Sequence, residues 1–396
     1  MSVTAAAGFK ASGIAAGLKT SGAPDVALVV NDGPISSAAA VFTSNRCNPV
    51  LWSEQAISTG SARAVVLNSG GANCYTGAAG FQIVHETAEL AGELLGVGPI
   101  DVQVCSTGLI GLLNDKDDLL GGVREAASAL SADGGAAAAT AIMTTDTVSK
   151  QAVRTGGGAG PGAADRTGGG AGGYTIGAMA KGAGMLAPAL ATMLVVITTD
   201  ADLAASDLDA ALRAATAQSF DRLDSDGCQS TNDTVLLMAS GAAEVSPDLA
   251  EFTSLLTEVC RDLALQLLAD AEGADHEIAI ETVNAASEQD ALEVSRSVAR
   301  SNLFKCAIFG KDPNWGRILA SVGTTDAAFD PADLDVALNG VWVCRQSGPA
   351  EDPSSIDLEQ RAVTVTIDLK AGKEAATIWT NDLTQAYVHE NSAYSS

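Results

Sequence analysis

One threonine, Thr192, lies where its hydroxyl could become a nucleophile. It follows Ala191 and precedes an apolar run, residues 193–197, whose β-branched residues are typical of a buried strand. Pro188 keeps the chain before it extended. A hydroxyl at the start of a buried strand is costly unless its oxygen finds a partner or a chemical role. Self-cleavage before Thr192 would supply that role, and the alternative is that Thr192 merely begins the strand.

The chemistry of such a cleavage needs no second side chain. The Thr192 hydroxyl attacks the carbonyl carbon of Ala191, the acyl group shifts from nitrogen to oxygen, and water opens the ester. The new α-amino group has an unperturbed pKa of about 7.7 to 8, so it can take the proton from the hydroxyl of its own residue. The sequence has three isolated histidines and no GxSxG, HExxH or P-loop string, which leaves little material for a serine triad or a zinc site.

Length and composition bound the class of protein. The chain has 396 residues, 47% of them hydrophobic, and its longest apolar run, residues 185–197, is too short to cross a membrane. We expect a soluble protein of one large or two medium domains. The N-terminus lacks the pattern of a secretion signal, so we expect a cytoplasmic protein. The net charge of −26 argues against nucleic acid or an anionic membrane as a partner. Seven widely spaced cysteines without a CxxC pair predict reduced thiols and no metal site.

Several turns and polar clusters are candidates for binding groups. Thr107 and Gly108 follow a predicted strand and could direct a hydroxyl and a backbone N–H into a cleft, although by pattern alone they are no more than a turn. Thr144 begins a polar cluster that by composition could simply cap a turn. Residues 224–233 are densely polar but lack the spacing of a calcium loop. We predict that they form a hydrogen-bonded loop beside a cleft.

The longest helix is predicted to begin with Ser246 as its N-cap and Pro247 as its first residue. Glu272 follows the end of this helix, where a carboxylate is electrostatically unfavourable and should have another partner, such as an ammonium group. Residues 154–173 contain RTGGGAG twice and predict a flexible, glycine-rich surface loop. A GxGxxG string within it follows no predicted strand, so we reject a dinucleotide site.

Strings along nearly the whole chain resemble the ornithine acetyltransferases, also called glutamate N-acetyltransferases, of arginine biosynthesis. KGAGMLAP followed by ATML resembles their processing site. The other matching strings, in chain order, are AGFKASGIAAGLK, LNSGGAN, CSTGLIG, IMTTD, STNDT, DPNWGR and ENSAYSS. Any one of them would be weak evidence, whereas the ordered set is specific.

The resemblance implies an α/β (α+β) fold of four layers, an αββα sandwich of the aminopeptidase and ornithine acetyltransferase type, with a smaller C-terminal lobe. Self-cleavage would give an alpha chain, residues 1–191, and a beta chain, residues 192–396, assembled as a heterotetramer of two copies of each. The implied acyltransferase moves acetyl from N-acetylornithine to glutamate, giving ornithine and N-acetylglutamate. Both substrates would use one site in a ping-pong reaction through an acetyl-threonine. No cofactor is implied, and the sequence leaves open whether acetyl-CoA is a second donor.

The resemblance also assigns residues to the site. Thr192 is the nucleophile and, through its new amine, the base, with the cleaved bond between Ala191 and Thr192. Thr107 and Gly108 form the oxyanion hole. We expect Lys181 to bind the carboxylate that both substrates share. The substrate-binding set as a whole is Thr144, Lys181, Thr192, Glu272, Asn391 and Ser396, and we expect Glu272 to bind the side-chain ammonium of ornithine.

Two other classes of function stay open on the sequence alone. A hydrolase of the same fold, such as an N-terminal-nucleophile aminopeptidase or amidase, would pass the acyl group to water, and only water exclusion separates it from a transferase. A non-catalytic binding protein would keep its chain intact at Thr192. The C-terminal tail is a structural test, because the resemblance requires Asn391 and Ser396 in the site whereas a chain terminus is usually frayed.

Overall fold

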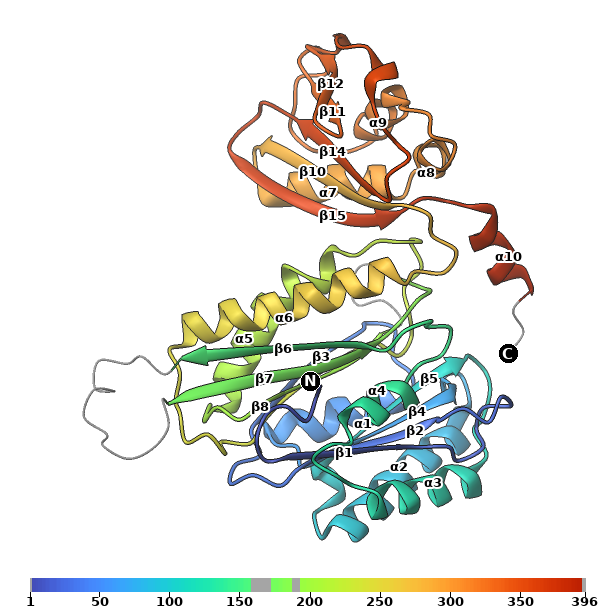
Figure 1. Cartoon of the computed structure of the whole chain (residues 1–396), viewed down its shortest axis with the longest axis vertical. Helices are drawn as coiled ribbons and strands as arrows, with labels where there is room; N and C mark the ends of the chain where they lie inside the picture. Colours follow the sequence, from blue (N-terminus) through green and yellow to red (C-terminus); the bar gives the residue numbers. More distant parts are fainter. Residues whose placement is uncertain (1, 158–171, 187–192, 394–396) are drawn as a thin grey trace.

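The structure, a computed structural model, describes residues 2–157, 172–186 and 193–393. Figure 1 shows a large layered body, built from β1 to β9 and the helices among them, and a smaller lobe that begins at β10. After the lobe, helix α10 (Gln385–Ala393) leads the chain back toward the body (Figure 1). In the part of the chain that is described, no helix is long and apolar enough to cross a membrane.

The first sheet of the body has four strands in the order β1-β2-β4-β5. β1, β2 and β4 are antiparallel neighbours, and β5 is parallel to β4. The outer face of this sheet packs against three amphipathic helices. The elements are β1 (Phe9–Ile14), β2 (Val26–Asn31), β4 (Ala64–Gly71), β5 (Val102–Leu109), α1 (Asn48–Ala56), α2 (Gly77–Leu95) and α3 (Lys116–Ser128). Because β4 and β5 run in the same direction, their carboxyl ends meet at one edge of the sheet.

The second sheet has five strands in the order β3-β9-β8-β7-β6. Helices α5 (Ala205–Ala217) and α6 (Leu249–Ala269) cover its outer face. The strands are β3 (Ala38–Phe42), β6 (Lys150–Gly157), β7 (Gly173–Lys181), β8 (Leu194–Thr199) and β9 (Thr234–Ala239). All six residues of β8 are buried, which explains its unbroken apolar run, and this strand begins and ends slightly later than the predicted residues 193–197.

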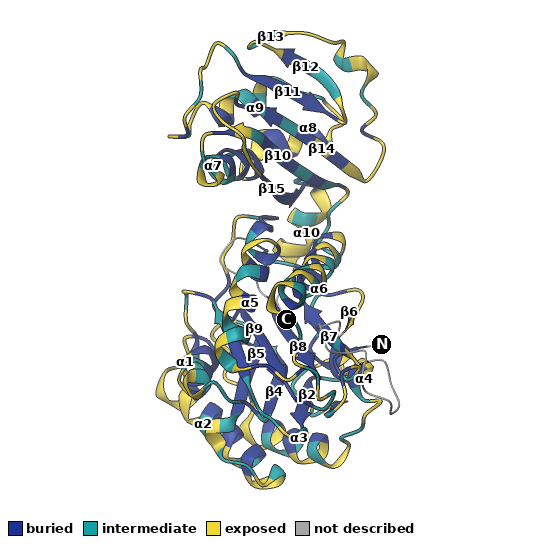
Figure 2. Ribbon diagram, turned by 90° about the vertical axis from the view of Figure 1, so that its left-hand side faces the viewer, coloured by how far each residue is buried: buried dark blue, intermediate teal, exposed yellow. Residues whose placement is uncertain are grey.

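The two sheets pack face to face and give the body the four predicted layers, αββα. Alternate residues of β8 show the packing, since Val195 and Ile197 lie in the core beneath α5 and α6. Leu194 and Val196 lie in the core between the sheets, together with Val65 of β4. Figure 2 shows the buried strands of both sheets enclosed by helices with exposed outer faces. Helix α4 (Gly135–Ala141) adds apolar residues to the core between the sheets.

The C-terminal lobe is a mixed sheet in the order β13-β12-β11-β14-β10-β15, packed against three helices. Its strands are β10 (Glu277–Ala285), β11 (Asp335–Leu338), β12 (Val341–Arg345), β13 (Gly348–Pro349), β14 (Ala362–Asp368) and β15 (Glu374–Asn381), and its helices are α7 (Glu288–Ala299), α8 (Asn302–Phe309) and α9 (Trp315–Val322). Buried residues alternate with more exposed ones along β14, which is typical of a sheet covered on one face.

Two local predictions were wrong. Helix α6 begins at Leu249, and its N-cap is Asp248, whose carboxylate accepts hydrogen bonds from the N–H groups of Ala250 and Glu251. The Ser246-Pro247 pair therefore precedes the helix, because the aspartate two residues later satisfies two of its free N–H groups. The predicted loop 154–173 is also shorter, since residues 154–157 belong to β6 and residue 173 to β7. Residues 158–171 of that loop lie outside the described residues.

Candidate active site

Six of the predicted site residues line one hollow of about 420 Å³. They are Thr107, Gly108, Thr144, Lys181, Glu272 and Asn391. The hollow also takes in Leu109, Ile110, Thr145, Gly184, Met185, Asp226, Cys228 and Tyr387. Its volume is in the range of small-molecule sites in proteins. The six predicted residues come from the end of β5, the segment between α4 and β6, the end of β7, the turn after α6 and the C-terminal helix α10.

Thr107 and Gly108 lie within strand β5, so the prediction that they form a turn after the strand was wrong, and their neighbours hold them in one conformation. Gly108 has φ +118°, a backbone conformation that glycine adopts readily. In the parallel pair β4–β5 it lies opposite Gly70, and a Cβ at position 108 would come within 2.5 Å of the Gly70 backbone. Thr107 is buried, and its hydroxyl lies 3.3 Å from Nζ of Lys181. A fixed N–H and a hydroxyl beside an ammonium group are suited to stabilising a developing oxyanion.

Lys181 ends strand β7 and is only 2% exposed. Its cross-strand neighbour is Leu194, two residues after Thr192 in the chain. Burial lowers the pKa of Lys181, whereas the negative charges of Asp146, Asp233 and Glu272 act to raise it. The strand register therefore places Lys181, an amine of lowered pKa, beside the start of β8. Thr192, the predicted nucleophile, comes two residues before this strand in the sequence.

Asp146 ties the Thr144 turn to the end of β7. Its carboxylate accepts the Thr144 N–H at 2.9 Å, the Gly182 N–H at 2.6 Å and Nζ of Lys150 at 2.7 Å. Burial opposes ionisation of Asp146, but the charges of Lys181 and Lys150 and these hydrogen bonds outweigh it and lower its pKa to about 2. Lys150 is itself fully buried and also binds Asp270 at 2.6 Å. This buried ion cluster fixes the wall of the hollow that carries Thr144.

Glu272 and Asn391 come from distant parts of the chain. Nδ2 of Asn391, on α10, donates a hydrogen bond to Oε2 of Glu272 at 3.0 Å. The Glu272 N–H donates to the Ala183 carbonyl at 2.9 Å, and a Cβ at Gly184 would come within 2.5 Å of the Glu272 carboxylate. Glycine at 184 thus leaves room for this carboxylate in the hollow. The C-terminal tail returns to this hollow as far as Asn391.

The family strings did not single out Asp226 and Tyr387, which also line the hollow. The Asp226 carboxylate accepts the Cys228 N–H at 3.0 Å, and burial raises its pKa. The pKa of Tyr387 is raised by burial and by the negative charge of Asp226. The available signal was the polar segment 224–233, and its predicted place beside a cleft is confirmed. Nothing local in the sequence marks Tyr387.

Three predicted site residues, Ala191, Thr192 and Ser396, lie outside the described residues. Their predicted roles are therefore untested. Met193, the first described residue after Thr192, is buried, and its N–H donates to Oδ1 of Asp233 at 3.0 Å.

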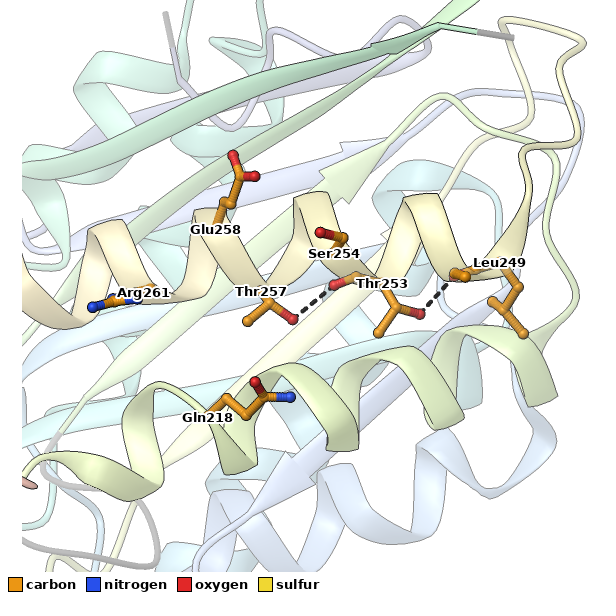
Figure 3. A pocket seen from close by; sticks show the side chains of 8 residues that line it. Gln218, Leu249, Thr253, Ser254, Thr257, Glu258 and Arg261 are labelled. Carbon is orange, nitrogen blue, oxygen red and sulfur yellow. Dashed lines mark hydrogen bonds between the residues drawn. The ribbon is translucent and has the colours of Figure 1, made fainter. Parts of the chain in front are cut away.

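A hollow of larger volume, about 730 Å³, lies elsewhere, between α5 and α6 (Figure 3). The hydroxyls of Thr253 and Thr257 in its wall donate to carbonyls of their own helix, at 2.7 Å each. It contains none of the predicted site residues, so we place the candidate site in the smaller hollow. Within residues 2–157, 172–186 and 193–393, no group of three or more His, Cys, Asp or Glu side chains could hold a metal ion.

Comparison with known protein families matches this chain to the ArgJ family, whose sequence model covers residues 10–396. Proteins called "Arginine biosynthesis bifunctional protein ArgJ" from Streptomyces coelicolor and from Thermobifida fusca are each 60% identical, over 100% of this chain and 100% of the relative. The one from Mycobacterium leprae is 51% identical, over 100% of this chain and 96% of the relative. Among solved structures, an ornithine acetyltransferase complexed with ornithine from Mycobacterium tuberculosis is 47% identical, covering 47% of this chain and 94% of that chain, with a TM-score of 0.41.

Proposed function

Because the chain belongs to the ArgJ family, we propose that it is a self-cleaving acetyltransferase of arginine biosynthesis that moves acetyl from N-acetylornithine to glutamate. The observation that carries the proposal is the shared hollow. The predicted oxyanion donors, which are Thr107 and Gly108, line it together with Lys181, Glu272 and Asn391. Lys181, which lines the hollow, pairs with Leu194 at the start of β8, and Leu194 comes two residues after Thr192 in the sequence.

Self-cleavage is the first proposed step. The Thr192 Oγ forms a bond to the carbonyl carbon of Ala191, the carbon–nitrogen bond breaks, and the nitrogen takes up the proton that the hydroxyl loses. Water then hydrolyses the ester, leaving a carboxylate on residue 191 and a free amine on Thr192. The products are chains of residues 1–191 and 192–396. We propose that two copies of each form the enzyme.

Acetyl transfer follows the same covalent logic. The Thr192 Oγ attacks the acetamide carbon of N-acetylornithine, and the α-amine of Thr192 takes the hydroxyl proton and passes it to the departing nitrogen of ornithine. The N–H of Gly108 and the hydroxyl of Thr107 stabilise the oxyanion. Ornithine leaves, the amine of glutamate attacks the acetyl ester, and N-acetylglutamate is released. One site serves both substrates in turn, so the kinetics are ping-pong.

Charge supports the proposed binding of both substrates. Lys181 provides a cation for the α-carboxylate that N-acetylornithine and glutamate share. The Glu272 carboxylate faces the same hollow and matches the side-chain ammonium that only the ornithine substrate carries. Thr144 and Asn391 add polar side chains to the walls, and we propose that Ser396 completes the set.

The relatives from Streptomyces coelicolor and Thermobifida fusca are named as bifunctional proteins. We propose that acetyl-CoA is the second acetyl donor here, used through the same acetyl-threonine. We also propose that the enzyme acts in the cytoplasm.

A transfer assay on purified full-length protein tests the proposal. We expect two shorter chains on a denaturing gel, and ornithine release from N-acetylornithine that rises with glutamate and yields an equal amount of N-acetylglutamate. Thr192→Ala should leave one intact chain and lower transfer by at least about 10⁴-fold, because it removes both nucleophile and base. Ornithine release that does not depend on glutamate would identify a hydrolase instead. An intact wild-type chain with full activity would overturn the mechanism.

A further inference from the structure

The polar loop of residues 225–234 holds the chain upstream of the predicted cleavage point. The Ser225 N–H donates to the Leu186 carbonyl at 2.5 Å. The backbone N–H groups of Met185 and Leu186 act to lower the pKa of Asp226, so they lie on the side of its carboxylate. Met185 has φ +56°, a left-handed conformation that costs a non-glycine residue free energy unless its surroundings hold it. The Leu186 side chain is fully buried against Ala271, so this end of the segment is fixed.

The other end of the same loop holds the chain downstream. Oδ1 of Asp233 accepts the Met193 N–H at 3.0 Å, and the Thr234 N–H donates to the Met193 carbonyl at 3.2 Å. Both side chains that flank this contact are buried, with Asp233 at 0% and Met193 at 1% exposed. Leu186 and Met193, the described residues on either side of residues 187–192, are therefore both hydrogen bonded to one loop.

We propose that the loop of residues 225–234 is a splint that positions the cleavage segment, with Asp233 and Asp226 as its positioning residues. The proposal rests on self-cleavage before Thr192. Attack of a hydroxyl on the preceding carbonyl needs the two groups held at bonding distance, and misplacement by about 1 Å can cost on the order of 100-fold in rate. Asp233 acts through the peptide group that joins Thr192 to Met193, so it fixes the carboxyl side of the residue that must react.

The splint also connects the two proposed product chains. Leu186 belongs to residues 1–191, whereas the loop belongs to residues 192–396. The hydrogen bond from Ser225 to Leu186 would therefore cross between the chains after cleavage, while Asp233 binds Met193 of its own chain. We infer that the same contacts that position the precursor also hold Met193 beside the loop in the cleaved protein.

A time course of self-cleavage in freshly translated full-length chain tests the splint. We expect Asp233→Ala to slow the loss of the intact band by at least about 10-fold, since it removes the acceptor for the Met193 N–H. Asp233→Asn retains an oxygen acceptor and should cleave within about threefold of the wild-type rate. Rescue by asparagine distinguishes positioning through a hydrogen bond from a need for the negative charge.

The control is Asp335→Ala in the C-terminal lobe. Asp335 is also a buried aspartate that accepts a backbone N–H, that of Gln346 at 2.7 Å, but its strand, β11, belongs to the lobe whereas β8 belongs to the body (Figure 1). It should lower the melting temperature and leave the cleavage rate unchanged. If Asp233→Ala does not fold, Asp226→Ala, at a partly exposed position of the loop, tests the other end and should slow cleavage by several-fold.

The outcomes separate this inference from the proposed function. An intact wild-type chain would refute self-cleavage itself. Wild-type cleavage together with unchanged rates in Asp233→Ala and Asp226→Ala would overturn the splint and leave the proposed function standing. Equal slowing in Asp233→Asn and Asp233→Ala would also overturn it, because the hydrogen-bond acceptor would then be irrelevant.

Discussion

Charged side chains are buried around the cleft of the body, whereas the ion pairs within the C-terminal lobe are in contact with water. Around the cleft, Lys150 and Asp233 are 0% exposed and Lys181 is 2% exposed. Among described residues, each ion pair formed within the lobe keeps at least one partner 29% or more exposed. Removing a charge from water costs several kcal/mol, so the lobe follows the common solution and the cleft does not. We infer that the buried charges of the cleft hold the segments around it in place.

Hydrogen bonding explains how the cleft tolerates these charges. The Asp146 carboxylate accepts hydrogen bonds from one ammonium group and two backbone N–H groups. These bonds replace the hydrogen bonds that water makes to an exposed carboxylate. The bond to Thr144 fixes a residue that lines the hollow, and the bond to Gly182 fixes the residue that follows Lys181. In the lobe, Lys311 and Glu359 form a pair whose side chains are 47% and 74% exposed, and this pair fixes no part of the site.

The largest expected effect sharpens this comparison with a lysine from each region. Lys150→Met should destabilise the protein by about 3–5 kcal/mol, because it leaves the buried carboxylates of Asp146 and Asp270 without their shared cation. Lys311→Met should cost less than about 1 kcal/mol, as is usual for an exposed ion pair. Urea denaturation at pH 7 measures both. Equal losses in the two variants would remove the distinction between the regions.

The sequence predicted the fold of the body and most of the hollow, for two different reasons. Periodicity identified β8 because a central strand buried on both faces needs a continuous apolar run. The family strings identified the lining residues, and those that are described converge on one hollow. Their roles are still predictions.

What the sequence did not predict depends on contacts between distant segments. Tyr387 lines the hollow with Asp226, which is 161 residues earlier (387 − 226), and no local pattern encodes that meeting. The start of α6 was missed for a local reason, since Ser246 and Asp248 are both acceptable N-caps and only the observed backbone shows which one the helix uses. The energetic role of Lys150 was also invisible, because burial of a lysine follows from its tertiary neighbours.

A medium effect is expected from the pH dependence of the cleft. The pKa of Asp146 is lowered to about 2 in the folded protein, against 3.8 in its ordinary state. A lowered pKa contributes stability that is present above pH 4 and is lost as the pH falls from about 4 to 2, and this shift corresponds to about 2 kcal/mol. Asp146→Asn should therefore make the free energy of unfolding less dependent on pH within that window. Denaturation at pH 5 and pH 2.5 measures the difference.

The control for this pH effect lies in the lobe. The Ser354 N–H lowers the pKa of Asp352, but that carboxylate is exposed to water. Asp352→Asn should follow the wild-type pH dependence closely. If Asp146→Asn also follows it, the buried lysines do not stabilise the charged form of Asp146 as the geometry indicates.

The smallest expected effect concerns which substrate the cleft charge selects. Glu272→Gln removes the negative charge but keeps an oxygen that can accept the hydrogen bond from Asn391. The KM for N-acetylornithine should rise about 10-fold, a loss of about 1.4 kcal/mol for an ammonium partner. The KM for glutamate should stay the same or fall, because its side chain is a carboxylate that Glu272 repels. Initial rates over a grid of both substrates give the two constants separately, and Glu359→Gln in the lobe should change neither. An equal rise in both constants would show that Glu272 shapes the hollow without selecting its ligand, and the contrast between functional charge in the cleft and solvated charge in the lobe would then fail at this residue.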